Sequence, residues 1–353
     1  MNLSAIIVSI LVLSMFIAKN IRSPRSSQQF SNWIVAIVSI LLVFAAAFRA
    51  WTVGADTWTF VDDYNSVPRM HFSGMLEQYI DYPGIYILMW IMGKLDLPVV
   101  CFFGVVEAIY LLCIYVFIKK FSEDRLFAYF CFFTIGLFFP SMNILKQIIS
   151  VGLALLSFCG FHDKKYLRSV LCFVLAFLFH QSSLIFLLAL FVYYYKNNKK
   201  LIKIFIIFTL IVAFVGNTLW SAVLSGFGNE HYQMYLESDN TYTATTLYYF
   251  ALIGIIAYLF RKDYHAIQPS LVNVYCVFIL MACVLQSFAT TYSISHRLAY
   301  FYVPFFIVFV PNCIYFMKNK ARANAIKVVI VAIMSFFCIY TQSKVPFTLL
   351  VNF

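Results

Sequence analysis

Charged residues at the ends of apolar segments are the residues of this sequence best suited to chemistry. Arg49 and Asp56 flank the point where an apolar run gives way to a polar loop, and Lys146 and Arg297 each begin a later apolar run. His180 lies between two short apolar runs. Because a charged group close to hydrocarbon is costly, several of them near segment ends predict an aqueous site at the membrane boundary.

These residue types suit a phosphate or diphosphate ligand and a proton transfer. Arginine offers a bidentate fork to phosphate oxygens and lysine a point charge, while a carboxylate or an imidazole accepts a proton. Any one cation could instead extend to lipid headgroups, and His180 could be a hydrogen-bonded core residue. Asp62, Asp63 and Asp239 are interpreted as solvated loop charges. Together, Arg49, Lys146, His180 and Arg297 lie at the ends of four segments, and this coincidence favours a functional site.

The composition is that of an integral membrane protein. Of 353 residues, 63% are hydrophobic and 11% charged, whereas soluble domains carry about 25% charged residues. Apolar runs of helical length exclude the alternating pattern of a β-barrel, so the chain must form a helix bundle. The net charge of +11 falls mostly in short loops between apolar runs, which indicates orientation in the membrane and no nucleic-acid partner.

The nine cysteines all fall inside apolar runs and form no Cys-x-x-Cys motif. We therefore expect small buried apolar side chains, with no disulfide, no metal site and no cofactor.

The sequence predicts an all-α fold, a polytopic membrane bundle of about 12 transmembrane helices in one integral membrane domain over residues 1–353. The apolar runs are 3–19, 32–49, 99–118, 126–142, 146–161, 167–180, 182–195, 202–223, 246–260, 271–289, 297–317 and 326–341. The pair 167–180 and 182–195 reaches only about 20 Å per segment, less than a hydrocarbon core of ~30 Å. We expect that pair to meet at a cavity beside His180.

The basic loops fix the orientation. Their clusters, expected inside, are 19–25, 119–125, 164–168, 196–203, 261–262 and 318–327. The alternation holds if Tyr82–Leu97 lies along the outer surface as a short helix and does not cross. Both termini are then outside, with external regions at 50–98 and 224–245. This topology places Arg49, Lys146, His180 and Arg297 on the same side.

The order of these residues resembles the EpsG-like family, which comprises Wzy-type polymerases of bacterial surface polysaccharides. The resemblance covers residues 44–310. Its motifs are Phe48-Arg49, Gly54-Ala55-Asp56-Thr57 followed by Tyr64, Tyr82-Pro83-Gly84-Ile85-Tyr86, Lys146-Gln147, Ala176-Phe177-Leu178-Phe179-His180-Gln181-Ser182, and Arg297 with Tyr300. Lys146 departs from the family's arginine, which keeps the charge and loses the guanidinium fork.

The resemblance implies glycosyl transfer between lipid-linked oligosaccharides at the periplasmic face of the bacterial inner membrane, with undecaprenyl diphosphate as the leaving group. The acidic first external loop is also similar to that of membrane glycosyltransferases of the GT-C architecture, which place a catalytic aspartate there. Asp56 is the expected base, with His180 as the alternate. The expected diphosphate- or substrate-binding residues are Arg49, Lys146, Gln147, Arg297, Tyr300 and Tyr64. The implied partners are the lipid-linked oligosaccharide, membrane lipid and a chain-length regulator.

Three other functions stay open. A ligase that joins finished polymer to its acceptor lipid shares nearly all of this chemistry. A flippase of lipid-linked oligosaccharides would also bind a diphosphate, but it should show two similar halves, which the sequence lacks. A membrane O-acyltransferase could use His180, but it has no use for the Asp56 loop.

Overall fold

The computed structural model describes residues 3–226, 245–289, 295–343 and 347–349, with side chains left out at 214–226. Of the described residues 83% are helical and none lies in a strand, which confirms the all-α prediction. By contacts between Cα atoms the chain forms two compact units, residues 1–184 with 329–353, and residues 185–328. The expectation of one domain over 1–353 stays a prediction.

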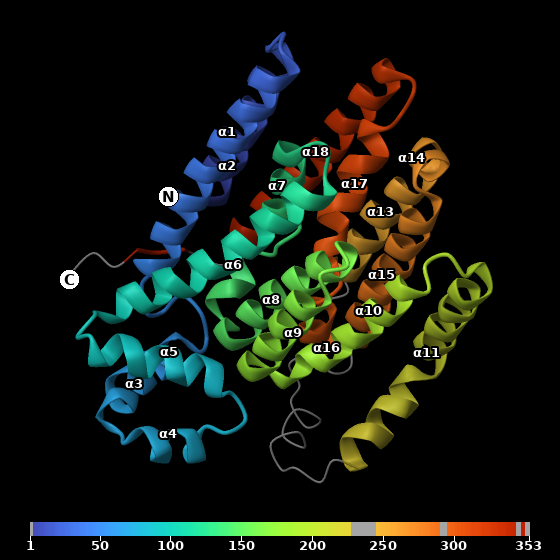
Figure 1. Ribbon diagram of the computed structural model, residues 1–353. Coiled ribbons are helices and arrows are strands. Elements are labelled where there is room, and N and C mark those ends of the chain that lie inside the picture. The colour runs from blue at the N-terminus through green and yellow to red at the C-terminus, as the bar shows by residue number, and fades with distance from the viewer. Residues whose placement is uncertain (1–2, 227–244, 290–294, 344–346, 350–353) are drawn as a thin grey trace. The chain divides into compact units, whose positions relative to one another are not determined.

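The first unit is built on seven helices of the described residues (Figure 1). They are α1 (Leu3–Asn20), α2 (Pro24–Ala47), α6 (Val99–Phe121), α7 (Arg125–Thr134), α8 (Leu145–His162), α9 (Tyr166–Phe179) and the later part of α18 (Lys320–Ser343). α6 packs on α2 and α8, and α8 packs on α9. Small residues bring α8 and α9 close together, with the Ser157 and Ser169 hydroxyls 3.1 Å apart and Gly160 facing the Ser169 backbone.

Short helices connect α2 to α6. They are α3 (Thr57–Ser66), the 3₁₀ turn η1 (Val67–Arg69), α4 (Phe72–Gln78) and α5 (Pro83–Lys94). Figure 1 shows α3, α4 and α5 grouped around the start of α6. With 12 residues, α5 is about 18 Å long, too short for a hydrocarbon core of ~30 Å. Its length agrees with the expected surface helix, and its orientation in the membrane stays a prediction.

The second unit is arranged around α15 (Pro269–Phe288), which packs against most of its neighbours. These are α10 (Phe186–Tyr194), α11 (Lys199–Gly226), α13 (Thr245–Leu259), α14 (Lys262–Ile267), α16 (Ser295–Ala299), the 3₁₀ turn η4 (Val303–Phe305) and α17 (Phe306–Tyr315). Aromatic rings fill its core: Phe278 and Phe305 have ring centroids 4.4 Å apart, and the buried Tyr302 hydroxyl donates to the Ile185 carbonyl at 2.6 Å.

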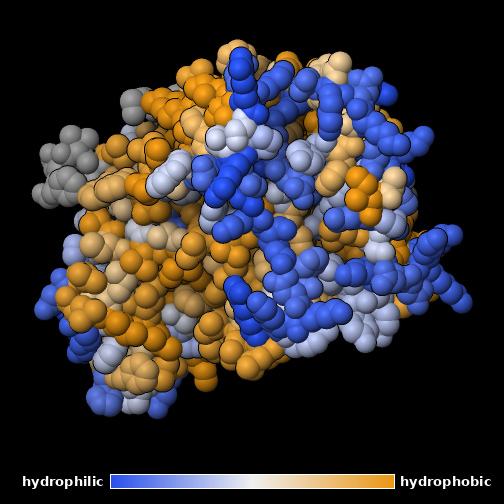
Figure 2. Space-filling view, turned by 45° about the horizontal axis from the view of Figure 1, so that its top comes forward, coloured by the Kyte–Doolittle hydropathy of each residue, from blue (hydrophilic) through white to orange (hydrophobic). Residues whose placement is uncertain are grey.

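The helices confirm a polytopic membrane protein. In the described part of the chain, seven helical segments are long and apolar enough to cross a membrane, counting Ser295–Tyr315 as one, and four more are shorter and apolar. Each predicted apolar run contains at least one helix, although the runs 126–142 and 297–317 are divided. Large apolar side chains are exposed along these helices, and the face in Figure 2 is hydrophobic over a broad area. Such a surface suits contact with lipid. The expected external region 224–245 falls almost wholly outside the described residues.

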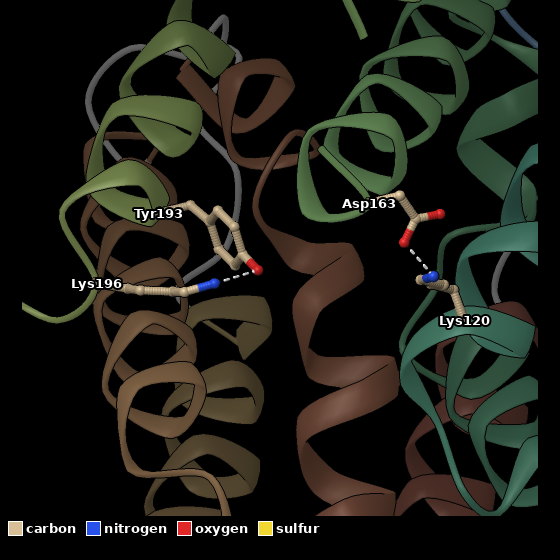
Figure 3. Close-up of polar contacts among 4 residues, drawn as sticks. All are labelled: Lys120, Asp163, Tyr193 and Lys196. Carbon is tan, nitrogen blue, oxygen red and sulfur yellow. Dashed lines mark hydrogen bonds and ion pairs between the residues drawn. The ribbon is translucent and has the colours of Figure 1, made fainter. Parts of the chain in front are cut away.

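Residues of two of the basic loops that are expected inside make polar contacts (Figure 3). In the first unit the Lys120 ammonium pairs with the Asp163 carboxylate, which links the end of α6 to the end of α8. In the second unit Lys196 donates to the Tyr193 hydroxyl at 2.6 Å and lies over that ring. These contacts order the loops; the side of the membrane on which they lie stays a prediction.

Candidate active site

Lys146 lies in the first turn of α8, in a cage of three aromatic rings. Its ammonium is 4.9 Å from the ring centroid of Tyr82, 5.0 Å from that of Tyr86 and 5.7 Å from that of Phe60. It also donates a hydrogen bond to the Tyr86 hydroxyl at 3.0 Å. Because α3 supplies Phe60 and α5 supplies Tyr86, the short connecting helices form the walls of the cage. Aromatic faces stabilise a cation that has lost part of its hydration.

Tyr86 links this lysine to a carboxylate. Its hydroxyl donates to Asp63 Oδ2 at 3.1 Å, its ring stacks on that of Tyr79 at 3.7 Å, and it is 4% exposed. Burial raises the pKa of Tyr86 well above its ordinary value, so the hydroxyl keeps the proton that it donates to Asp63. Burial also raises the pKa of the Asp63 carboxyl, while the Tyr86 hydrogen bond and the charge of Lys146 act in the opposite direction.

Asp56 supplies a second carboxylate whose charge acts on Lys146. It occupies the N-cap position of α3 without a capping hydrogen bond from its side chain, and it is partly exposed. An aspartate at this position normally caps the helix, so here the carboxylate is left available for another role. The charges of Asp63 and Asp56 both act on the Lys146 ammonium.

His180 reaches the cage through Tyr82. α9 ends at Phe179, and His180 takes an extended conformation that brings its ring to 5.1 Å from that of Tyr82. His180 Nδ1 accepts a hydrogen bond from the Ser182 backbone N–H at 3.2 Å. The neutral imidazole therefore carries its proton on Nε2. The structure thus brings together three of the expected residues, Asp56, Lys146 and His180.

Arg49 occupies a different environment, because its guanidinium is buried at 2% exposure. Nη1 donates to the Ala46 carbonyl at 2.6 Å, Nη2 to the Met142 carbonyl at 3.3 Å and Nε to Thr57 Oγ1 at 3.4 Å. The guanidinium also lies 4.1 Å from the Phe103 ring centroid. In this conformation Arg49 joins the end of α2 to the segment that precedes α8. Its role as a phosphate ligand stays a prediction.

The other expected residues are less closely connected to Lys146. Gln147 is buried within α8, and the buried Tyr64 donates its hydroxyl to the Leu97 carbonyl at 2.7 Å. Arg297 and Tyr300 belong to the second unit, where the ring of Tyr300 is 5.8 Å from that of His296. Their convergence with Lys146 stays a prediction.

Sequence reasoning missed three residues. Asp63 was interpreted as a solvated charge, yet Asp56, Phe60 and Asp63 are spaced four and three residues apart, which places them on one face of α3. Tyr86 ends the motif Tyr82-Pro83-Gly84-Ile85-Tyr86 but was not among the expected site residues, since its bridging role comes from the packing of α5. Glu107 is an acidic residue inside the apolar run 99–118, and that position is itself a signal of function.

Within the described part of the chain, no group of three or more His, Cys, Asp and Glu residues could hold a metal ion. The arrangement offers a partly exposed ammonium, two carboxylates whose charges act on it, and the imidazole of His180. Such groups can bind an anion and accept a proton.

Comparison with known proteins identifies a family. The model of the EpsG family matches residues 32–351, nearly the whole chain. No curated protein and no solved structure matches.

Proposed function

Because the chain belongs to the EpsG family, whose members are Wzy-type polymerases, we propose that it polymerises lipid-linked oligosaccharide repeat units. Family membership establishes a membrane polymerase of polysaccharide biosynthesis. The finer parts of the proposal are the undecaprenyl-diphosphate donor, the bacterial inner membrane and a site that faces the periplasm.

The observation that carries the proposal is the environment of Lys146. Its ammonium lies beside the Tyr86 hydroxyl, and the charges of Asp63 and Asp56 act on it. In the proposed reaction an acceptor hydroxyl attacks the anomeric carbon of the growing chain while the bond from that carbon to the diphosphate oxygen breaks. Negative charge develops on the diphosphate, and a cation at that position stabilises it.

Asp56 takes the hydroxyl proton in this proposal, because its carboxylate is near Lys146 and does not cap α3. His180 is the alternate base, although its Nδ1 already accepts a hydrogen bond, so it would have to rearrange. Lys146 binds the diphosphate. Arg49 and Arg297 remain proposed phosphate ligands, and Gln147, Tyr64 and Tyr300 remain proposed substrate contacts.

The test is polymerisation of lipid-linked repeat units by the purified protein. We expect Asp56→Asn to lower kcat by about 10²–10⁴-fold, the usual contribution of a general base. Asp62→Asn, the same change at an exposed position of α3, should keep the wild-type rate. A folded Asp56→Asn protein with wild-type kcat would remove Asp56 from the mechanism, and His180→Ala would then test the alternate base.

A gel of cell-surface glycan separates the other functions. Cells without this protein should lose the ladder of polymer lengths and keep a single-unit band. Loss of every unit would indicate a flippase or a ligase. A complete ladder of altered mass would indicate an acyltransferase.

A further inference from the structure

Glu107 is a buried acid that the proposed reaction does not use. It lies in the middle of α6 with 2% exposure, and its Oε2 accepts a hydrogen bond from Ser141 Oγ at 2.6 Å. Its Oε1 has no hydrogen-bond partner among the residues that the structure describes. A carboxylate at such a place is costly unless a cation compensates it.

Arg49 is the compensating cation. Its guanidinium lies over the ring of Phe103, which is four residues before Glu107 and therefore on the same face of α6. The charges of Arg49 and Glu107 act on each other. Arg49 at the end of α2 and Glu107 in the middle of α6 are thus a pair of buried residues whose charges interact, without a direct hydrogen bond between them among the contacts that the structure describes.

Both members of the pair hold the segment 141–143, which leads into α8. Ser141 donates to Glu107, and the Met142 carbonyl accepts from Arg49. Asn143 Oδ1 accepts from the Ala55 backbone N–H at 2.9 Å. Three consecutive residues thus connect the start of α8 to α6, to Arg49 and to the loop that carries Asp56. Lys146 lies in the first turn of α8.

We propose that Glu107 is a positioning residue: through Ser141 and Arg49 it sets the placement of the Asp56 loop relative to Lys146. It does not touch the substrate. The inference rests on the proposed function for its effect on rate, whereas its effect on the loop can be measured without any reaction.

The test uses Glu107→Gln in the full-length protein, in lipid nanodiscs. The amide keeps an acceptor for Ser141 and removes the charge that faces Arg49. We expect kcat to fall by about 100-fold with little change in KM, because an error of about 1 Å in the placement of a catalytic group costs that much. We also expect the amides of residues 50–60, Ala55 among them, to exchange hydrogen about tenfold faster, because the loop opens locally more often.

The matched control is Tyr110→Phe. It removes a buried hydroxyl from α6. That hydroxyl donates to the Leu137 carbonyl at 3.3 Å, and Leu137 lies outside the segments 49–57 and 141–143. This variant should keep the wild-type kcat and the wild-type exchange of residues 50–60. A double-mutant cycle adds a second criterion: if Glu107 acts through Arg49, the losses in kcat of Glu107→Gln and Arg49→Gln are less than additive.

Each outcome decides between positioning and general stability. Wild-type exchange at residues 50–60 in Glu107→Gln would overturn the proposal, and so would faster exchange spread evenly over the whole chain or additive losses in the cycle. If Glu107→Gln does not fold, Ser141→Ala breaks the same connection and is judged by the same measurements. If the wild-type protein does not polymerise, the proposed function fails, and hydrogen exchange alone decides whether Glu107 positions the loop.

Discussion

The Tyr86 hydroxyl is the most informative atom to remove, because it bridges the cation and a carboxylate of the candidate site. Tyr86→Phe keeps the ring that stacks on Tyr79 and faces Lys146, and it deletes the contacts at 3.0 Å to Lys146 and 3.1 Å to Asp63. A hydrogen bond to a charged group contributes about 1.5–3 kcal/mol. Lys146 and Asp63 are both partly exposed, so water replaces some of that loss, and we expect about 3 kcal/mol in all.

The kinetic effect follows from the same contacts. If half of the loss appears in the transition state, kcat falls about tenfold, since 1.4 kcal/mol corresponds to a factor of ten. The pH profile should also move. The Tyr86 hydrogen bond lowers the pKa of Asp63, so without it that pKa rises further. If the ionised Asp63 is needed to hold Lys146, the acidic limb of the rate profile shifts to higher pH.

The assay is kcat against pH for the purified protein and lipid-linked repeat units, and Tyr79→Phe is the matched control. Tyr79 is the stacked partner of Tyr86, and its hydroxyl makes no hydrogen bond in the described part of the chain. This control should keep both kcat and the position of the acidic limb. A Tyr86→Phe protein with an unchanged kcat and an unmoved limb would refute the bridging role.

Two further predictions concern stability. Gly54→Ala should destabilise the protein by about 2–4 kcal/mol in thermal or denaturant unfolding. The reason is that φ of Gly54 is +97° and that an added Cβ would lie 2.6 Å from Asn143 Oδ1. The control is Gly74→Ala in α4, which should leave the stability unchanged because an added Cβ meets nothing within 4 Å there. Asp63→Asn should alter the dependence of the melting temperature on pH. Burial raises the pKa of Asp63 above 3.8, so the ionised form costs stability above the raised pKa and that cost vanishes as the pH falls towards 3.8. The wild-type protein should therefore gain stability relative to Asp63→Asn as the pH falls from above the raised pKa towards 3.8, and a constant difference would contradict the assignment.

Hydropathy predicted where the helices lie but not where the backbone leaves the helix. The run 126–142 was expected to be one helix, yet α7 ends at Thr134, Gly136 has φ +87°, and a 3₁₀ turn, η2 (Phe139–Met142), contains Pro140. The run 297–317 is likewise divided, with η4 placed at Pro304. Apolar composition reports burial in lipid or core, whereas glycine and proline set the backbone, and these residues were the signal that separates the pieces.

The candidate site, too, was predicted only in part from the sequence. Charge next to hydrocarbon identified Asp56, Lys146 and His180, and the structure brings them together through Tyr82 and α3. Charge next to hydrocarbon could not identify the bridging role of Tyr86 or the role of Asp63, because these roles depend on how α3 and α5 pack on α8. Arg49 shows most clearly what charge next to hydrocarbon does not predict. A cation at a segment end can face an aqueous site or be buried among backbone carbonyls, and only its partners, here the carbonyls of Ala46 and Met142, distinguish the two.

The lysine at position 146, where the family pattern has arginine, fits the cage that the structure forms around it. A compact ammonium can approach three ring faces and one hydroxyl, whereas a guanidinium fork is best used against two oxygens in one plane. Asp63 and Asp56 compensate the partly exposed charge of Lys146 while no substrate is bound. In the proposed reaction the diphosphate must compete with these carboxylates for Lys146. When it does, Lys146 turns from the carboxylates to the diphosphate, and Asp56 is left to accept the proton of the attacking hydroxyl.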